Sequence, residues 1–203
     1  MQYTIFDIET TGLSPRSAAI VQFAYITCDS RLFPIRGRNY YFYKEGMPWS
    51  KEAEAIHGLS QEFLSQYKDQ YDENLIHMYQ VVHRATLVGH NSDSFDVPFV
   101  RQFLAGEGME MPVPTQCYDT MKLWTKDYGR KPKLGALLSF LGLEEDAIIR
   151  TAQLMFGADA GDLKAHNACY DVALTLACFR KAVEEGKCSL SSAMAPPVSV
   201  DLY

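Results

Sequence analysis

Two acidic residues lie two positions apart near the start of the chain, in the segment Phe6-Asp7-Ile8-Glu9. In an extended strand, alternate side chains share a face, so Asp7 and Glu9 would lie side by side with their Cα atoms about 6.5 Å apart. Two adjacent carboxylates repel each other, and a hard divalent cation relieves that repulsion by binding both. The pattern favours a metal site at a strand end. The alternative is a pair of exposed acids ahead of a turn.

A second acidic segment, His90-Asn-Ser-Asp-Ser-Phe-Asp96, follows an expected strand and opens an expected helix. Asp93 at the N-cap with Asp96 three residues later would form a variant of the capping box. Acidic side chains in a first helical turn also suit the helix dipole. Capping therefore accounts for Asp96 without a metal, and the segment alone leaves both interpretations open.

His166 and Asp171 form a third pair near the end of the chain. Five residues along a helix rotate by about 140°, so the two side chains could not share a face if both were helical. We expect His166 in a loop, Asn167 at the N-cap and Asp171 in the first turn. A loop histidine beside an anchored carboxylate suits a general base next to a metal ligand. The alternative is a surface histidine ahead of a capped helix.

In this order, the three segments resemble the motifs of the DnaQ-like 3′→5′ exonucleases, and the spacing His166-x4-Asp171 resembles the DEDDh branch. A sister branch carries Tyr-x3-Asp, which would need a tyrosine where this chain has Asn167. The resemblance is to the proofreading-subunit type and covers most of the chain. It implies a ribonuclease H-like fold and hydrolysis of phosphodiester bonds from a 3′ end, releasing nucleoside 5′-monophosphates.

The resemblance also implies a role for each catalytic residue. Asp7 would bridge two divalent cations, and Glu9 and Asp171 would complete the ion that carries the attacking water. Asp96 would support the second ion, and His166 would be the general base. The expected metal is Mg²⁺, for which Mn²⁺ would substitute. By the same resemblance, seven residues would bind the substrate or shape its site: Thr10, Thr11, Gly12, Leu13, His57, Asn91 and Phe95.

The periodicity of apolar residues and the positions of glycine and proline predict the secondary structure that must position these residues. Strands are expected at residues 2–8, 20–28, 36–43, 85–90 and 115–118. Helices are expected at residues 51–57, 60–66, 70–84, 93–106, 119–127, 134–141, 144–156 and 167–185. This order predicts an α/β fold, a ribonuclease H-like mixed five-stranded sheet flanked by helices. We expect one exonuclease domain over residues 1–185 and a C-terminal tail over 186–203 that is either flexible or docked on the surface.

The net charge of −6 does not suggest a nucleic-acid binder, but bound cations and a local basic patch can offset it. Such a patch comprises Lys122, Lys126, Arg130, Lys131 and Lys133. Taken alone, this cluster favours a solvated helix face and loop over a phosphate-binding patch. Five cysteines without a C-x-x-C pair argue against a disulfide framework or a zinc ribbon. With no signal-like segment or apolar run of about 20 residues, we expect a cytoplasmic protein without membrane contact.

The expected partner is nucleic acid, with single-stranded DNA favoured over RNA. An RNA-trimming exonuclease of the same family is the alternative, since RNA selection depends on contacts to the 2′-OH that the sequence does not locate. A polymerase or another protein is a further candidate partner. A non-catalytic binding module on the same fold would predict a broken metal set, whereas all five expected catalytic positions are filled.

Overall fold

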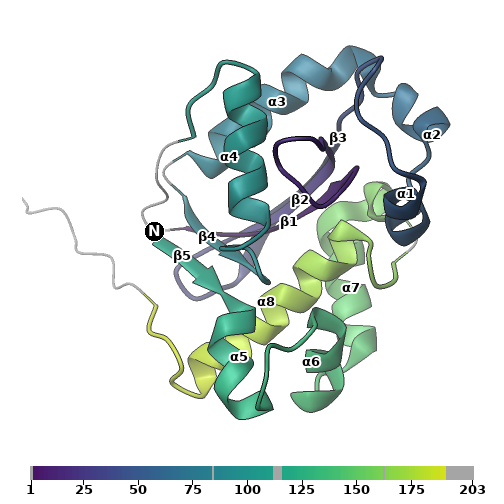
Figure 1. Cartoon of the computed structure of the whole chain (residues 1–203). Coiled ribbons are helices and arrows are strands. Elements are labelled where there is room, and N and C mark those ends of the chain that lie inside the picture. Colours follow the sequence, from purple (N-terminus) through teal and green to yellow (C-terminus); the bar gives the residue numbers. More distant parts are fainter. Residues whose placement is uncertain (1, 84, 112–115, 162, 191–203) are drawn as a thin grey trace, which may run out of the picture.

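The computed structural model describes residues 2–83, 85–111, 116–161 and 163–190 and is drawn in Figure 1. Its centre is a five-stranded sheet in the order β3-β2-β1-β4-β5. The strands are β1 (Tyr3–Thr10), β2 (Ile20–Cys28), β3 (Pro34–Tyr41), β4 (Thr86–Gly89) and β5 (Gln116–Asp119). Strands β1, β2 and β3 form an antiparallel meander, whereas β4 and β5 continue the sheet in parallel with β1. The predicted mixed five-stranded sheet is confirmed.

Helices cover both faces of this sheet (Figure 1). The α-helices are α1 (Lys51–His57), α2 (Gln61–Ser65), α3 (Tyr71–Val82), α4 (Asp96–Gly106), α5 (Thr120–Tyr128), α6 (Leu134–Phe140), α7 (Glu145–Phe156) and α8 (Ala168–Glu184). Two 3-10 turns, η1 (Lys68–Gln70) and η2 (Gly157–Ala160), precede α3 and follow α7. None of the helices within the described ranges is both long enough and apolar enough to cross a membrane.

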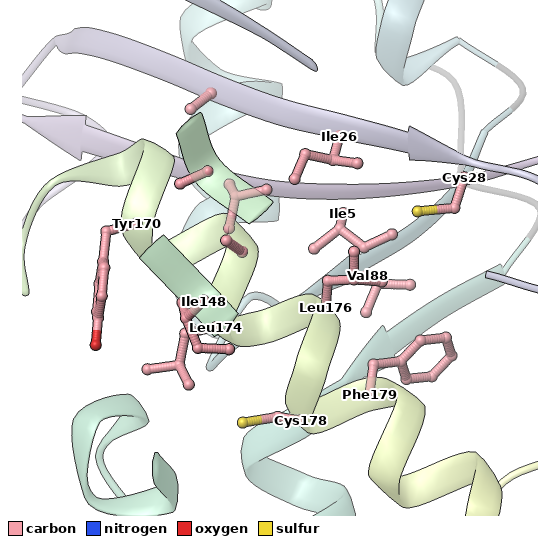
Figure 2. Close-up of a cluster of buried hydrophobic side chains, with 14 of the residues drawn as sticks. Ile5, Ile26, Cys28, Val88, Ile148, Tyr170, Leu174, Leu176, Cys178 and Phe179 are labelled. Atoms are coloured by element: carbon pink, nitrogen blue, oxygen red, sulfur yellow. The ribbon is translucent and has the colours of Figure 1, made fainter. Parts of the chain in front are cut away.

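Alternation along β1 divides the core into two layers. Tyr3 and Ile5 point toward α8, whereas Phe6 and Ile8 point toward α3 and α4. Figure 2 shows α8 side chains packed over Ile5, Ile26 and Val88 of the sheet. Each fully buried apolar side chain of this size stabilises the fold by about 1.5–3 kcal/mol. Helix α8 is therefore held firmly against the strand that carries Asp7 and Glu9.

The helix expected at 93–106 begins only at Asp96. Residues before it form a turn in which Asn91 has a φ of 60°. The Asp119 carboxylate accepts hydrogen bonds from the backbone N–H groups of Asn91 at 2.8 Å and Asp93 at 3.4 Å. Asp93 does not cap α4, because its carboxylate pairs with Lys122 and no side chain caps that helix. The capping-box interpretation of Asp93 and Asp96 is therefore wrong.

Other boundaries differ by a few residues. The strand expected at 36–43 spans Pro34–Tyr41, and the helix expected at 70–84 is preceded by η1 and ends at Val82. The predicted tail starts on the protein surface, where Lys187 pairs with Asp127 at 2.9 Å and the Tyr118 hydroxyl donates to the carbonyl of Ser189. The predictions that concern residues 84, 115 and 191–203 lie outside the described residues, and the domain boundary at 185 stays a prediction.

Gly37 lets α7 approach the sheet closely. A Cβ atom at this position would lie 2.7 Å from the Met155 carbonyl oxygen and 2.8 Å from the Met155 Cβ. We expect Gly37→Ala to lower the free energy of unfolding by about 1–3 kcal/mol, because the α7 backbone must shift. Gly106→Ala is the matched control, since a Cβ there meets nothing within 4 Å. Urea unfolding followed by circular dichroism measures both, and equal midpoints would contradict this account.

Candidate active site

Strand β1 carries Asp7 and Glu9 beyond the point where β4 stops pairing with it. The pairs between β1 and β4 end at Ile5, whereas β2 pairs with β1 as far as Thr10. Asp7 and Glu9 have the same parity as Tyr3 and Ile5, so both carboxylates project on the face covered by α8. The sheet therefore presents two carboxylates on a strand segment that is open on one side.

Helix α8 supplies a third carboxylate. Asn167 caps the helix, and its side-chain oxygen accepts hydrogen bonds from the backbone N–H groups of Cys169 at 2.9 Å and Tyr170 at 3.3 Å. Asp171 follows in the first turn, as expected. One carboxylate oxygen each from Asp7, Glu9 and Asp171 lies within 4.8 Å of the others. Residues from opposite ends of the described chain thus form a compact group of oxygen donors.

Asp96 approaches the same group from α4. It is the first residue of that helix and is only 4% exposed. Its carboxylate accepts hydrogen bonds from its own backbone and from the backbone of Ile8 on β1. It lines the same cavity as Asp7, Glu9 and Asp171 but lies outside the tight three-residue group. The structure therefore brings all four predicted carboxylates to one cavity.

Burial raises the pKa of all four carboxyl groups, and repulsion by neighbouring carboxylates adds to this for Asp7, Glu9 and Asp96. Burial, followed by the charges of Asp96, Asp171 and Glu9, raises the pKa of Asp7 well above its usual range. Burial and the charges of Asp171 and Asp96 raise the pKa of Glu9 to about 9. Burial also raises the pKa values of Asp96 and Asp171 to about 7, against the lowering effect of backbone hydrogen bonds. In the protein alone, the group resists carrying its full negative charge.

His166 lies on a turn before α8, as the spacing predicted. Its φ is 65°, and the residue is exposed. Its backbone N–H donates a hydrogen bond of 3.1 Å to the Asp171 carboxylate. The next residue fixes the turn, because the Asn167 side-chain amide donates to the carbonyl of Ala160 at 3.1 Å. The backbone at His166 is therefore anchored while its imidazole is open to solvent at the cavity.

Two adjoining cavities enclose this region. One has a volume of about 720 Å³ and contains all five predicted catalytic residues together with Leu13, Asn91 and Phe95. The other has a volume of about 660 Å³ and is lined mainly by apolar atoms. It contains Thr10, Thr11, Gly12, Leu13, His57 and Phe95, among others. Leu13 and Phe95 line both cavities, so the seven predicted substrate-binding residues border one continuous region with the carboxylates.

The threonines differ from Leu13 in what they offer a ligand. The Thr10 hydroxyl donates to the carbonyl of Gly12 at 2.7 Å, and the Thr11 hydroxyl accepts from the backbone N–H of Ala19 at 2.9 Å. Both threonines are buried, whereas Leu13 is 87% exposed. The threonine side chains therefore shape the turn, whereas the exposed Leu13 side chain lies where the two cavities meet.

His57 and Asn91 are held by local hydrogen bonds. His57 Nδ1 accepts from the backbone N–H of Leu59 at 3.0 Å, and burial lowers the pKa of this imidazole. Its Nε2 atom is buried without a hydrogen-bond partner among the described residues. Asn91 contributes its strained backbone to the turn fastened by Asp119. The Leu59 hydrogen bond thus fixes the His57 ring, and burial disfavours its charged form.

The structure adds Lys133 to the site, which the motifs did not single out. It lines the carboxylate cavity, whereas Lys122 of the same basic patch pairs with Asp93. The loop before Lys133 is fixed by His90, whose ring nitrogens contact the Thr120 hydroxyl at 2.9 Å and the carbonyl of Pro132 at 3.0 Å. No sequence signal distinguishes Lys133 from its basic neighbours, because the distinction arises only from packing.

Sequence relatives of the chain include DNA polymerases. It is 26% identical to a PolC-type DNA polymerase III of Ureaplasma parvum over 179 residues, which is 88% of this chain and 11% of that protein. It is 34% identical to the DNA polymerase III subunit epsilon of Rickettsia conorii over 110 residues, covering 50% of this chain and 43% of that one. The chain thus spans less than half the length of these relatives.

Solved structures share the fold at lower identity. E. coli exonuclease I in complex with a dT13 oligonucleotide matches with a TM-score of 0.68 and 18% identity, over 88% of this chain and 40% of that one. Its zinc-bound form in complex with single-stranded DNA matches with a TM-score of 0.68 and 20% identity, over 91% and 40%. These matches confirm the ribonuclease H-like fold. The exonuclease family model matches residues 4–179. Because that match spans most of the chain, the protein belongs to the exonuclease family of nuclease hydrolases, and the resemblance to DnaQ-like exonucleases is confirmed.

Proposed function

We propose that the chain hydrolyses single-stranded DNA from its 3′ end and releases nucleoside 5′-monophosphates with the help of two divalent cations. The observation that carries this proposal is the group of carboxylate oxygens from Asp7, Glu9 and Asp171 within 4.8 Å of one another. Asp96 and His166 line the same cavity, which completes the predicted catalytic set. This complete set also argues against a non-catalytic binding module.

The chemistry of the donor group fits hard divalent cations. Every donor is a carboxylate oxygen, which is the ligand that Mg²⁺ and Mn²⁺ prefer. The raised pKa values of Asp7 and Glu9 mean that the protein alone does not compensate their charges, as bound cations would. Asp7, Glu9 and Asp171 would hold the ions, with Asp96 in support. When bound, two cations neutralise developing charge in phosphodiester hydrolysis and stabilise the attacking and leaving oxygens.

The remaining chemistry belongs to the chain's own side chains. The His166 imidazole accepts the proton of the attacking water, and its exposed turn lets the proton leave to solvent. Leu13 and Phe95 contact the terminal base and ribose across the boundary of the two cavities. Lys133 faces the negative charge of the substrate phosphates. Together these contacts orient the terminal phosphodiester against the carboxylates.

The names of the relatives support DNA as the substrate. Two relatives are DNA polymerase III proteins, and the matched exonuclease I structures hold single-stranded DNA. A polymerase partner fits the same relatives, although each extends well beyond the part that this chain covers. We therefore propose DNA as the substrate and keep a polymerase partner as a prediction.

Cation binding should be visible in protein stability without any substrate. The pKa of Glu9 is about 9 in the folded protein and about 4.3 in the unfolded chain, so the folded state holds the Glu9 proton more tightly. The protonated carboxyl therefore stabilises the fold fully below about pH 4.3, and this stabilisation is lost as pH rises through about 9. At mildly alkaline pH, we expect Asp7→Asn to raise the melting temperature of the metal-free protein and to reduce the increase caused by Mg²⁺. In the wild type, each tenfold excess of Mg²⁺ over its dissociation constant adds about 1.4 kcal/mol.

Exposed Asp69 provides the matched control, because Asp69→Asn removes the same charge from a residue that does not line the carboxylate cavity. It should leave both the metal-free melting temperature and the Mg²⁺ effect unchanged. If neither Mg²⁺ nor Mn²⁺ changed the melting temperature of the wild-type protein at any pH, the proposed metal site would be excluded. EDTA should also abolish nuclease activity.

His166 should control turnover more than substrate affinity. We expect His166→Ala to lower kcat by about 10²–10⁴-fold, because the attacking water loses its proton acceptor. Lys133→Ala is the comparison variant, since it lines the same cavity without a proton-accepting group, and it should raise KM more than it lowers kcat. Steady-state digestion of a single-stranded oligonucleotide measures both. Wild-type kcat in His166→Ala would disprove the assigned base.

The polarity and the sugar preference can be tested on one set of oligonucleotides. We expect stepwise shortening of a 5′-labelled DNA strand, protection by a blocked 3′ end, and no cutting of a circular single strand, because the terminal nucleotide must enter the apolar cavity. Matched RNA should be digested more slowly than DNA. Fragments from the circular strand would exclude exonuclease action, and faster digestion of RNA would favour the RNA-trimming alternative.

A further inference from the structure

A polar cavity lies on the opposite face of the sheet from the catalytic carboxylates. It has a volume of about 510 Å³ and is bordered by the first part of β1, by β2 and β3, and by the C-terminal half of α3. Thr4 marks its position on β1, and this residue has the opposite parity to Asp7 and Glu9. The cavity therefore lies on the other face of the sheet from the candidate active site and at the opposite end of β1.

Positive charge dominates the walls of this cavity. Arg36 lines it, and no aspartate or glutamate does so among the residues that the structure describes. Within the same residues, Arg36 forms no salt bridge. Its guanidinium instead donates to the hydroxyl of Tyr25 at 3.2 Å, and Tyr25 is fully buried. Arg36 is exposed, so its charge is open to a ligand in a cavity that has no acidic side chain among its described lining residues.

Two histidines add unmet hydrogen-bonding capacity. His77 and His83 border the cavity, and the Nδ1 atom of each is buried without a hydrogen-bond partner among the described residues. Buried polar atoms without partners are uncommon in folded proteins, and a bound ligand supplies the partner. His77 also stacks on Tyr40, with ring centroids 5.4 Å apart and planes inclined by 22°.

We propose that this cavity binds a phosphate group, either as the free ion or as a monoester, with Arg36 as its principal charge contact and His77 and His83 as further hydrogen-bond donors. A guanidinium matches the geometry of phosphate oxygens and forms two parallel hydrogen bonds with them. The end of α3 carries a partial negative charge of about one half, which is smaller than the full charge of Arg36. Tyr40 and His77 offer aromatic surface for a nucleoside attached to the phosphate. The volume suits a nucleotide or inorganic phosphate.

The test uses the full chain in EDTA, so that metal-dependent binding at the catalytic carboxylates does not contribute. Isothermal titration calorimetry with inorganic phosphate, deoxyadenosine 5′-monophosphate and deoxyadenosine compares the two sources of phosphate with a neutral nucleoside. We expect saturable binding of at least one phosphate-bearing ligand and none of deoxyadenosine. Binding of inorganic phosphate alone would identify the free ion, and tighter binding of the monophosphate would identify a nucleotide; both support the site.

Arg36→Gln should weaken this binding by about tenfold or more, because it removes a charged hydrogen-bond donor. Arg38→Gln is the matched control, since Arg38 lies two residues along β3, is exposed and does not line the cavity. If Arg36→Gln does not fold, His77→Phe keeps the ring over Tyr40 and removes the nitrogens. Equal losses in the variants at 36 and 38, or no saturable binding of either phosphate, would overturn the proposal.

Histidine NMR signals locate the ligand independently. Addition of the phosphate-bearing ligand should shift the imidazole resonances of His77 and His83 and leave those of His57 and His166 in place. Shifts confined to His57 and His166 would place the ligand at the catalytic face and overturn the proposal. Nuclease activity of Arg36→Gln should equal that of the wild type, so the outcome is distinguishable from a failure of the proposed nuclease function.

Discussion

The constraint on which this structure depends is the repulsion among carboxylates that are buried close together at one end of the sheet. Four carboxyl groups border one cavity; burial raises the pKa of each, and repulsion raises it further for Asp7, Glu9 and Asp96. Such an arrangement opposes folding unless apolar packing elsewhere compensates it. The two packed layers on either side of the sheet supply this compensation. The site is therefore an unfavourable local arrangement that the rest of the fold makes rigid.

Three different kinds of element share the positioning. A central strand fixes the spacing of Asp7 and Glu9, and a capped helix fixes Asp171 over them. The turn before that helix holds His166, whose backbone is bonded to the Asp171 carboxylate while its ring remains exposed. The proposed hydrolysis requires this combination, since residues that hold cations must not move whereas the proton of the attacking water must leave.

Much of this arrangement could be predicted from sequence because its causes are local. Alternation along a strand placed Asp7 and Glu9 on one face, and helical rotation placed His166 off the helix. The start of α4 was predicted wrongly, because Asp119 fastens the preceding turn from a distant position in the chain. Lys133 could not be distinguished from its basic neighbours either, because its position at the cavity also depends on contacts between segments far apart in the chain. What sequence patterns miss here is contact between segments that only the folded chain brings together.

The short pairing between β4 and β1 has a consequence for position 96. Where β4 no longer reaches, the Asp96 carboxylate takes the place of a neighbouring strand by accepting a hydrogen bond from the Ile8 backbone. The same carboxylate borders the cavity in which cations would bind. One side chain thus satisfies a backbone donor at the end of the strand pairing and also borders the proposed ion site. Replacements at 96 face two unrelated demands, and a substitute adequate for the first can still fail the second.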